Sequence, residues 1–367
     1  MNHRIFAQAV LSTGLCLTHA APSRTCSPDW EIVPSPSVAG KENVLTSVAV
    51  IAEDDAWAVG YSYAGNEYQT LTLHWDGVSW TIIPSPSLSS HSLLLGVSAS
   101  ATDDVWAVGN VFDPAQMLIE HWDGAQWTVV PSPDPGGSPR LNAVTALAPD
   151  DAWAVGQTGP LAGYSDPLFV HWDGQTWTVA PSPPNAAGRL AVTAVSTNDI
   201  WSTGPSRLRD NSALFTHWDG ASWTVVPNPP MGADDFVSMT GISAVASNDV
   251  WAVGQRQSSD CFGESCIYWE NGIVERWDGA TWSPAPPPLF YTNARAVTTQ
   301  SAQSIWVTGN DPSNQQPVSR WDGTSWTGVR SLGSFASLAS TPSGDVWAVA
   351  SIRASTLRTL IARYSCR

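Results

Sequence analysis

Tryptophan recurs along this chain with a regular spacing, and that spacing constrains the fold more than any other feature. Of the 21 tryptophans, 20 match a repeating position and only Trp269 stands apart. The first position lies in a D-x-W or similar step, the second opens W-D-G, and the third closes W-D-G-x-x-W. In that order the series are Trp57, Trp106, Trp153, Trp201, Trp251, Trp306 and Trp347; Trp75, Trp122, Trp172, Trp218, Trp277 and Trp321; and Trp80, Trp127, Trp177, Trp223, Trp282 and Trp326, with Trp30 as a further match.

The two ends of the chain complete one another. Trp30, in W-E-I-V-P-S-P, matches Trp80 in W-T-I-I-P-S-P, and residues 362–364 match residues 73–75, so the last repeat lacks a piece that the N-terminus supplies. Repeats of roughly 40 to 50 residues rich in β-formers indicate propellers or solenoids, and a solenoid needs caps at two free ends. The sequence therefore predicts an all-β fold: a seven-bladed β-propeller with four-stranded blades, closed by the N-terminal strand.

The first full repeat shows how a blade is built. In strand B, Trp57 and Val59 point to one side while Ala58 and Gly60 point to the other, so a large face can pack on the small face of the next blade. Asp76-Gly77 has turn chemistry, because glycine supplies positive φ and the aspartate can bond nearby backbone N–H groups. Strands A to D are predicted at residues 45–52, 56–62, 70–75 and 80–84, with a loop at 63–69.

The N-terminus predicts export. Residues 1–20 combine Arg4, an apolar stretch over 5–17 and small residues at 18–20, as in a secretory signal peptide. The apolar stretch is too short to span a membrane, so no membrane insertion is expected. We expect residues 21–367 to form a single propeller domain, secreted after cleavage.

Cysteine usage fits an oxidising compartment. Cleavage would remove Cys16 and leave an even number of cysteines, which predicts two disulfides. Three pairings are possible. The repeat alignment favours Cys26–Cys366, because both flank the turn that other blades close with Asp-Gly, and it leaves Cys261–Cys266 to staple a local loop.

Charge excludes two classes of partner. The formal net charge is −16 and Lys41 is the only lysine. Such a chain is not expected to bind nucleic acid or an anionic membrane surface.

Loop variability points to one face of the propeller. The A–B and C–D turns are short and nearly identical between repeats, whereas the B–C loops and D–A connections vary, and binding residues concentrate on variable loops of a rigid scaffold. Aromatic residues there could stack on apolar sugar faces, although Trp269 could instead cover a core within its own insertion. The aromatic candidates are Trp269, Tyr268, Tyr63, Tyr164 and Tyr291, and Asp166 and Asp210 are further ligand-binding candidates on the same face.

Three arginines near the starts of innermost strands could ring the channel mouth and bind a carboxylate or sulfate. They are Arg140, Arg189 and Arg295. The alternative is that each pairs with a nearby loop carboxylate.

Metal and catalytic signatures are weak. The histidines at positions 74, 121, 171 and 217 occupy one position in four successive blades, too far apart for a shared zinc, so we expect them to pack beside the hairpin tryptophan. No metal and no cofactor is predicted. The chain has no G-x-S-x-G, H-E-x-x-H, P-loop or dinucleotide motif. Asp166 and Asp210, with Asp234 and Asp235, lie on the variable face and could serve a glycosidase only if two converge.

The repeat L-x-x-V-x-A…D-D-V-W-A-V-G…H-W-D-G-x-x-W-T-V-V-P-S-P resembles the tryptophan-rich propeller repeats of secreted bacterial proteins. Its D-G-x-x-W turn is similar to the Asp-box hairpin of sialidase-like propellers and seven-bladed lectins, although Asp and Gly are adjacent here. The prediction is a secreted binding module for glycans or a cell-surface polymer. The alternatives are a structural or protein-interaction scaffold of the cell envelope, and a glycoside hydrolase or lyase.

Overall fold

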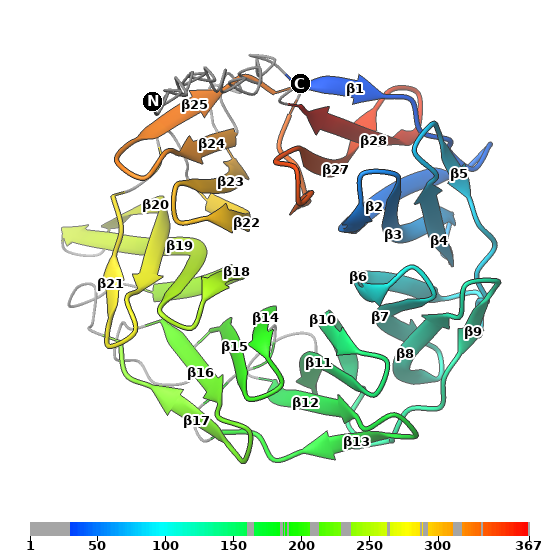
Figure 1. Ribbon diagram of the computed structural model, residues 1–367, viewed down its shortest axis with the longest axis horizontal. Coiled ribbons are helices and arrows are strands. Elements are labelled where there is room, and N and C mark those ends of the chain that lie inside the picture. The colour runs from blue at the N-terminus through cyan, green and yellow to red at the C-terminus, as the bar shows by residue number, and fades with distance from the viewer. Residues whose placement is uncertain are drawn as a thin grey trace, which may run out of the picture.

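The predicted ring is confirmed (Figure 1). The computed structural model describes residues 30–159, 165–183, 186, 188, 191–205, 213–228, 236–262, 265–286, 288, 293–310, 318–331 and 333–365. Within them, the strands form seven four-stranded antiparallel sheets arranged as blades around a central channel.

The blades, numbered one to seven along the chain, each run from an inner strand at the channel to an outer edge strand. In that order the strands are β2 (Glu42–Ala52), β3 (Asp55–Ala64), β4 (Glu67–Trp75) and β5 (Trp80–Ile82); β6 (Ser92–Ala101), β7 (Asp104–Phe112), β8 (Ala115–Trp122) and β9 (Trp127–Val129); β10 (Arg140–Ala148), β11 (Asp151–Thr158), β12 (Asp166–Trp172) and β13 (Trp177–Ala180); β14 (Ala191–Ser196), β15 (Asp199–Gly204), β16 (Leu214–Trp218) and β17 (Trp223–Val226); β18 (Phe236–Ala246), β19 (Asp249–Phe262), β20 (Ser265–Trp277) and β21 (Trp282–Pro284); β22 (Asn293–Ser301), β23 (Ser304–Asn310), β24 (Val318–Trp321) and β25 (Trp326–Val329); and β26 (Ser337–Ser340), β27 (Val346–Arg353), β28 (Leu357–Tyr364) and β1 (Glu31–Val33).

The N-terminal strand closes the ring. β1 pairs antiparallel with β28, with Glu31 opposite Arg363. The Trp30 ring lies 5.8 Å from that of Tyr364, so these two residues stand where other blades carry their hairpin tryptophans. The signal sequence and both cysteines of the proposed Cys26–Cys366 disulfide lie outside the described residues, so those predictions remain.

Tryptophans also hold neighbouring blades together. The ring of Trp57 in β3 lies 4.8 Å from Trp122 and 5.0 Å from Trp127, the hairpin pair of the next blade. All the remaining junctions between blades repeat this contact. Between blades six and seven, Trp306 packs on Trp30 and Tyr364, which replace the hairpin pair. Each of these strand-B rings is almost fully buried. Trp57 and Val59 of blade one share a core cluster with Ala107 of blade two, as the predicted packing of a large face on a small face requires.

The glycine of strand B is required for a reason that the sequence pattern does not show. A Cβ on Gly60 would lie 1.9 Å from the carbonyl oxygen of Val44, in the inner strand of the same blade. The close approach arises where β2 bulges between Leu45 and Ser47. Glycine is therefore required within the blade, at the bulge.

The Asp-Gly turns are confirmed. Gly77 has a φ of +90°, and Oδ1 of Asp76 accepts hydrogen bonds from the backbone N–H groups of Val78 and Ser79. These bonds lower the pKa of Asp76 below its ordinary value.

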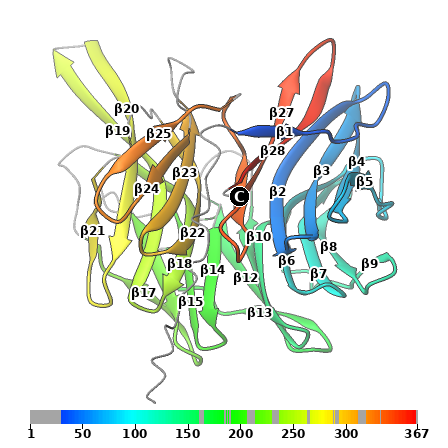
Figure 2. The same cartoon turned by 45° about the horizontal axis from the view of Figure 1, so that its top comes forward.

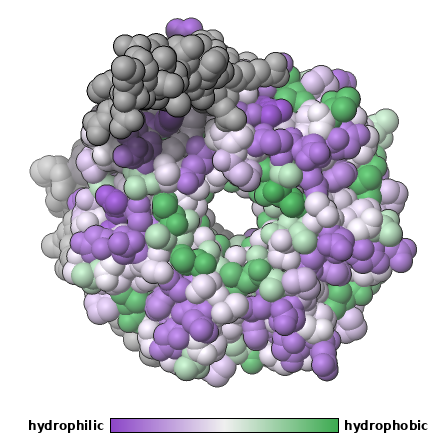
Figure 3. Space-filling view, viewed as in Figure 1, coloured by the Kyte–Doolittle hydropathy of each residue, from purple (hydrophilic) through white to green (hydrophobic). Residues whose placement is uncertain are grey.

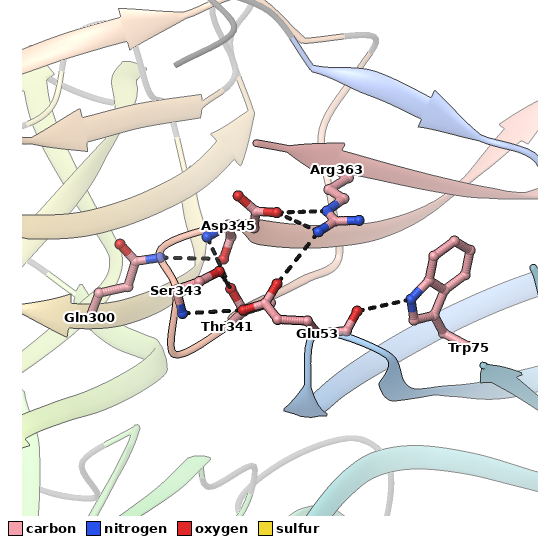
Figure 4. Close-up of polar contacts among 7 residues, drawn as sticks. All are labelled: Glu53, Trp75, Gln300, Thr341, Ser343, Asp345 and Arg363. Carbon is pink, nitrogen blue, oxygen red and sulfur yellow. Dashed lines mark hydrogen bonds and ion pairs between the residues drawn. The ribbon is translucent and has the colours of Figure 1, made fainter. Parts of the chain in front are cut away.

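A polar network joins blades seven and one on the face that carries these turns (Figure 4). Oε1 of Glu53 accepts from the N–H of Ser343 at 3.2 Å, and Arg363 lies between Glu53 and Asp345, 3.5 Å from Glu53 Oε2. Partial burial alone would raise the pKa of Glu53, but hydrogen bonds from Ser343 and Thr341 and the charge of Arg363 lower it overall.

Candidate functional site

An aromatic cluster forms on the variable face, where blades one and two meet. It consists of Tyr61, Tyr63, Tyr68 and Phe112. The rings of Tyr63 and Tyr68 stack at 5.2 Å with their planes 17° apart, and Tyr61 lies 5.8 Å and Phe112 6.3 Å from Tyr68. Phe112 is 40% exposed, and the three tyrosines are partly exposed. The cluster therefore presents aromatic surface to solvent.

Strand extension creates this cluster, and it corrects the predicted loop at 63–69. β3 and β4 continue to Ala64 and Glu67, which pair and leave a two-residue turn with Gly65 at φ +59°. Tyr63 and Tyr68 become direct cross-strand neighbours, a pairing that brings side chains into contact. Alternation along β3 puts Tyr61 on the same face as Tyr63.

The connection between β5 and β6 fixes the cluster from the side. The N–H of Tyr68 donates to Ser90 O at 2.7 Å, and the N–H of Phe112 donates to His91 O at 3.1 Å. One segment thus bonds to hairpins of two blades. Burial, and then the neighbouring Tyr63 and Tyr68, raise the pKa of Tyr61, so Tyr61 stays uncharged at neutral pH.

Polar side chains border the aromatic cluster. Ser90 and His91 contact each other through Oγ and Nδ1 at 3.1 Å beside the cluster. Gln69, which accepts from Nζ of Lys41, follows Tyr68 directly in β4 and so points to the other face of the hairpin. The site therefore combines ring faces with hydrogen-bonding groups, as pockets for small polar ligands do.

The other aromatic candidates lie elsewhere. Trp269 stands on blade five with 42% of its surface exposed, on the long β19–β20 hairpin that projects beyond the rest of the ring (Figure 2). It pairs with Ser258, and the backbone of Tyr268 pairs with Ser259. The structure therefore does not bring Trp269 together with Tyr63. Tyr164 and Tyr291 lie outside the described residues.

The arginine candidates also separate. Arg295 is exposed and lines the central cavity, whereas Arg140 is half-buried at the start of β10 and is not among the lining residues. Arg189 lies outside the described residues. The cavity has a volume of about 240 Å³ and is bounded by inner strands of all seven blades; the space-filling view shows the opening at the centre of the ring (Figure 3).

The predicted carboxylates show no convergence among the described residues. Asp166 is exposed at the start of β12, and Asp210, Asp234 and Asp235 lie outside the described residues. No group of three or more His, Cys, Asp or Glu side chains in the described part of the chain could hold a metal ion. Across the same residues, no helix is long and apolar enough to cross a membrane. Cys261 and Cys266 stand opposite each other in the β19–β20 backbone register, and their disulfide remains a prediction.

The repeated histidines pack on a different tryptophan from the expected one. The ring of His74 lies 4.5 Å from Trp57 of strand B, not beside the hairpin tryptophan, and its Nε2 lies 2.9 Å from Asp55 Oδ1. In blade five the guanidinium of Arg276 takes this place over Trp251. At this position the basic group thus packs on the strand-B tryptophan of its own blade.

The fold defines the class of protein, a seven-bladed propeller, and comparison with solved structures agrees. The chain is similar to YCF48 bound to D1 peptide, with TM-score 0.62 and 16% identity over 95% of this chain and 100% of that chain. It is also similar to YCF48 from Cyanidioschyzon merolae, with TM-score 0.56 and 16% identity over 92% and 98%. A six-bladed fungal lectin with a fucose recognition mode, from Aleuria aurantia, has TM-score 0.47 and 16% identity over 80% and 96%. No family model matches the sequence, and no curated protein does.

Proposed function

We propose that this protein is a secreted binding module that recognises glycans, free or in a cell-surface polymer, at the aromatic cluster of Tyr61, Tyr63, Tyr68 and Phe112. The observation that carries the proposal is the stacked, solvent-facing pair of Tyr63 and Tyr68. Sugar rings have an apolar face that packs on aromatic rings, while their hydroxyls need hydrogen-bonding partners. Ser90 and His91 supply such partners at the border of the cluster.

The geometry also favours binding over catalysis at this place. The cluster holds no pair of carboxylates, which a glycosidase would need on either side of the scissile bond. Its backbone is held by hydrogen bonds to a neighbouring segment, so the rings are arranged before the ligand arrives, which lowers the entropy cost of binding.

Glycan-array binding tests this function. We expect the wild type to bind one or a few glycans, and the double variant Tyr63→Ala/Tyr68→Ala to lose at least about fivefold in affinity, since stacking on two rings contributes on the order of 1–3 kcal/mol. Phe236→Ala is a matched control, because Phe236 is a similarly exposed aromatic on blade five. Trp269→Ala tests the projecting hairpin separately.

Three results would reject the proposal: an array without a binder, binding that survives in the double variant, or binding lost only in Trp269→Ala. Co-purification of a protein with a non-binding wild type would favour the scaffold alternative. The mass of protein recovered from the culture medium tests whether residues 1–20 are removed on secretion.

A further inference from the structure

The central cavity contains chemistry that the aromatic cluster does not use. Among the described residues, five inner strands have a bulge near their start, at the level of the cavity, and in each of these bulges the unpaired residue lines the cavity. These residues are Thr46, Leu95, Asn142, Thr240 and Arg295. A bulge redirects the side chain of the extra residue, so these positions decide what a ligand in the channel would meet.

Hydroxyl groups in the cavity are engaged in holding the blades together. Oγ1 of Thr46 lies 3.0 Å from Val59 O in its own blade and 3.1 Å from Leu94 O in the next. Thr240 repeats the arrangement between blades five and six. The serines at 47 and 337 accept backbone N–H groups of the following blade. These groups stabilise the ring and have little capacity left for a ligand.

Asn142 and Arg295 differ from these residues. Neither side chain forms a hydrogen bond or ion pair with any residue that the structure describes, and Arg295 is the only charged residue among the described residues that line the cavity. Their strands, β10 and β22, lie on opposite sides of the channel (Figure 1). A guanidinium thus faces the channel from one side and a side-chain amide from the other.

We propose that the central cavity binds a small carboxylate-bearing ligand of the size of a hexuronic acid, with its carboxylate on Arg295 and its hydroxyl groups on Asn142. Arginine forms paired N–H···O bonds with a carboxylate, and the asparagine amide both donates to and accepts from hydroxyls. The volume of about 240 Å³ lies below the roughly 300–1,000 Å³ of pockets for drug-sized ligands, which favours a small molecule.

Calorimetric titration with sodium glucuronate at low ionic strength tests this proposal. We expect a Kd on the order of 1 mM for the wild type, at least tenfold weaker binding by Arg295→Gln, and about threefold weaker binding by Asn142→Ala. Arg353→Gln is the matched control, because Arg353 is an exposed arginine of blade seven that does not line the cavity. Added salt should weaken binding, and glucose, which lacks the carboxylate, should not bind in the cavity.

The aromatic variant separates this proposal from the proposed function. Tyr63→Ala/Tyr68→Ala should bind glucuronate as the wild type does, even where it loses its array glycan. The proposal is overturned if the wild type gives no titratable heat, if Arg295→Gln binds as tightly as the wild type, if glucose competes equally, or if the aromatic variant alone loses glucuronate.

Discussion

Two buried carboxyl groups occupy the same place in different blades. Glu120 and Glu275 both stand two residues before a W-D-G tryptophan, and both side chains are fully buried. Burial raises the pKa of Glu120 to about 8, partly offset by Ser85, and raises that of Glu275 to about 7, partly offset by Asn228. Ser85 and Asn228 are the central residues of corresponding Pro-x-Pro segments in the preceding blades. The folded protein therefore holds protons that the unfolded chain releases.

The sign of the resulting pH dependence is fixed. In the folded protein the pKa of Glu120 exceeds its ordinary value of 4.5. Its contribution to the free energy of unfolding is therefore fully present below about pH 4.5 and declines as pH rises towards 8. We expect Glu120→Gln to match the wild type near pH 5 and to be more stable near pH 8, by on the order of 1–4 kcal/mol. Thermal unfolding of the wild type and the variant between about pH 5 and pH 8 measures this difference in stability. Glu67→Gln, at an exposed position, is the control. Parallel curves for wild type and variant would contradict it.

Gly60 gives a second prediction at this scale. Gly60→Ala forces a Cβ against the Val44 carbonyl, so we expect a loss of roughly 2–4 kcal/mol in the free energy of unfolding. Gly241→Ala is the comparison, because its Cβ would meet its nearest neighbours at 3.3–3.4 Å and a small shift relieves it. Denaturant unfolding of both variants tests this, and equal losses would show that the bulge yields easily.

At the scale of single elements, the sequence predicted each blade but not the site. Blades follow from a repeat, since Trp57, Asp76 and Gly77 have equivalents along the whole chain. The aromatic cluster has no repeat behind it. It needs β3 and β4 to extend to Ala64 and Glu67, and it needs Phe112 from the next blade. The length of this hairpin depends on a single turn glycine. The sequence therefore indicates that Tyr63 lies in a variable segment, but it does not indicate that Tyr63 stacks on Tyr68.

The connection between β5 and β6 yields the prediction for this scale. Oγ1 of Thr70 contacts Ser85 Oγ at 2.8 Å and Ser87 Oγ at 3.0 Å, which ties the connection to β4. We expect Thr70→Val to speed hydrogen exchange at residues 87–91 and to weaken glycan binding about two- to fivefold, at a cost of about 1 kcal/mol in stability. Thr81→Val, at an exposed position on β5, is the control. Unchanged exchange would show that the backbone bonds alone hold the segment.

The closed ring makes the whole molecule depend on its first strand. A solenoid tolerates a frayed end because each repeat contacts only its neighbours, but here β1 supplies the outer strand of blade seven. Trp30 packs against Tyr364 of that blade, against Trp306 of blade six, and against Phe335 in the connection between them. Its counterpart Trp223 makes the equivalent contacts with Trp153 and Phe169 in the middle of the chain. The two residues thus have the same packing and differ in chain position.

This pair allows closure itself to be measured. If β1 is as firmly bound as a strand within the chain, Trp30→Ala and Trp223→Ala should each lower the free energy of unfolding by about 3–5 kcal/mol, since both leave a large cavity between blades. Both should also keep a single cooperative transition. A much smaller loss for Trp30→Ala would mean that β1 detaches readily, because a strand that is already partly released has little packing to lose. Guanidinium unfolding followed by tryptophan fluorescence and by circular dichroism distinguishes the two cases, since detachment of β1 alone would change fluorescence before secondary structure is lost.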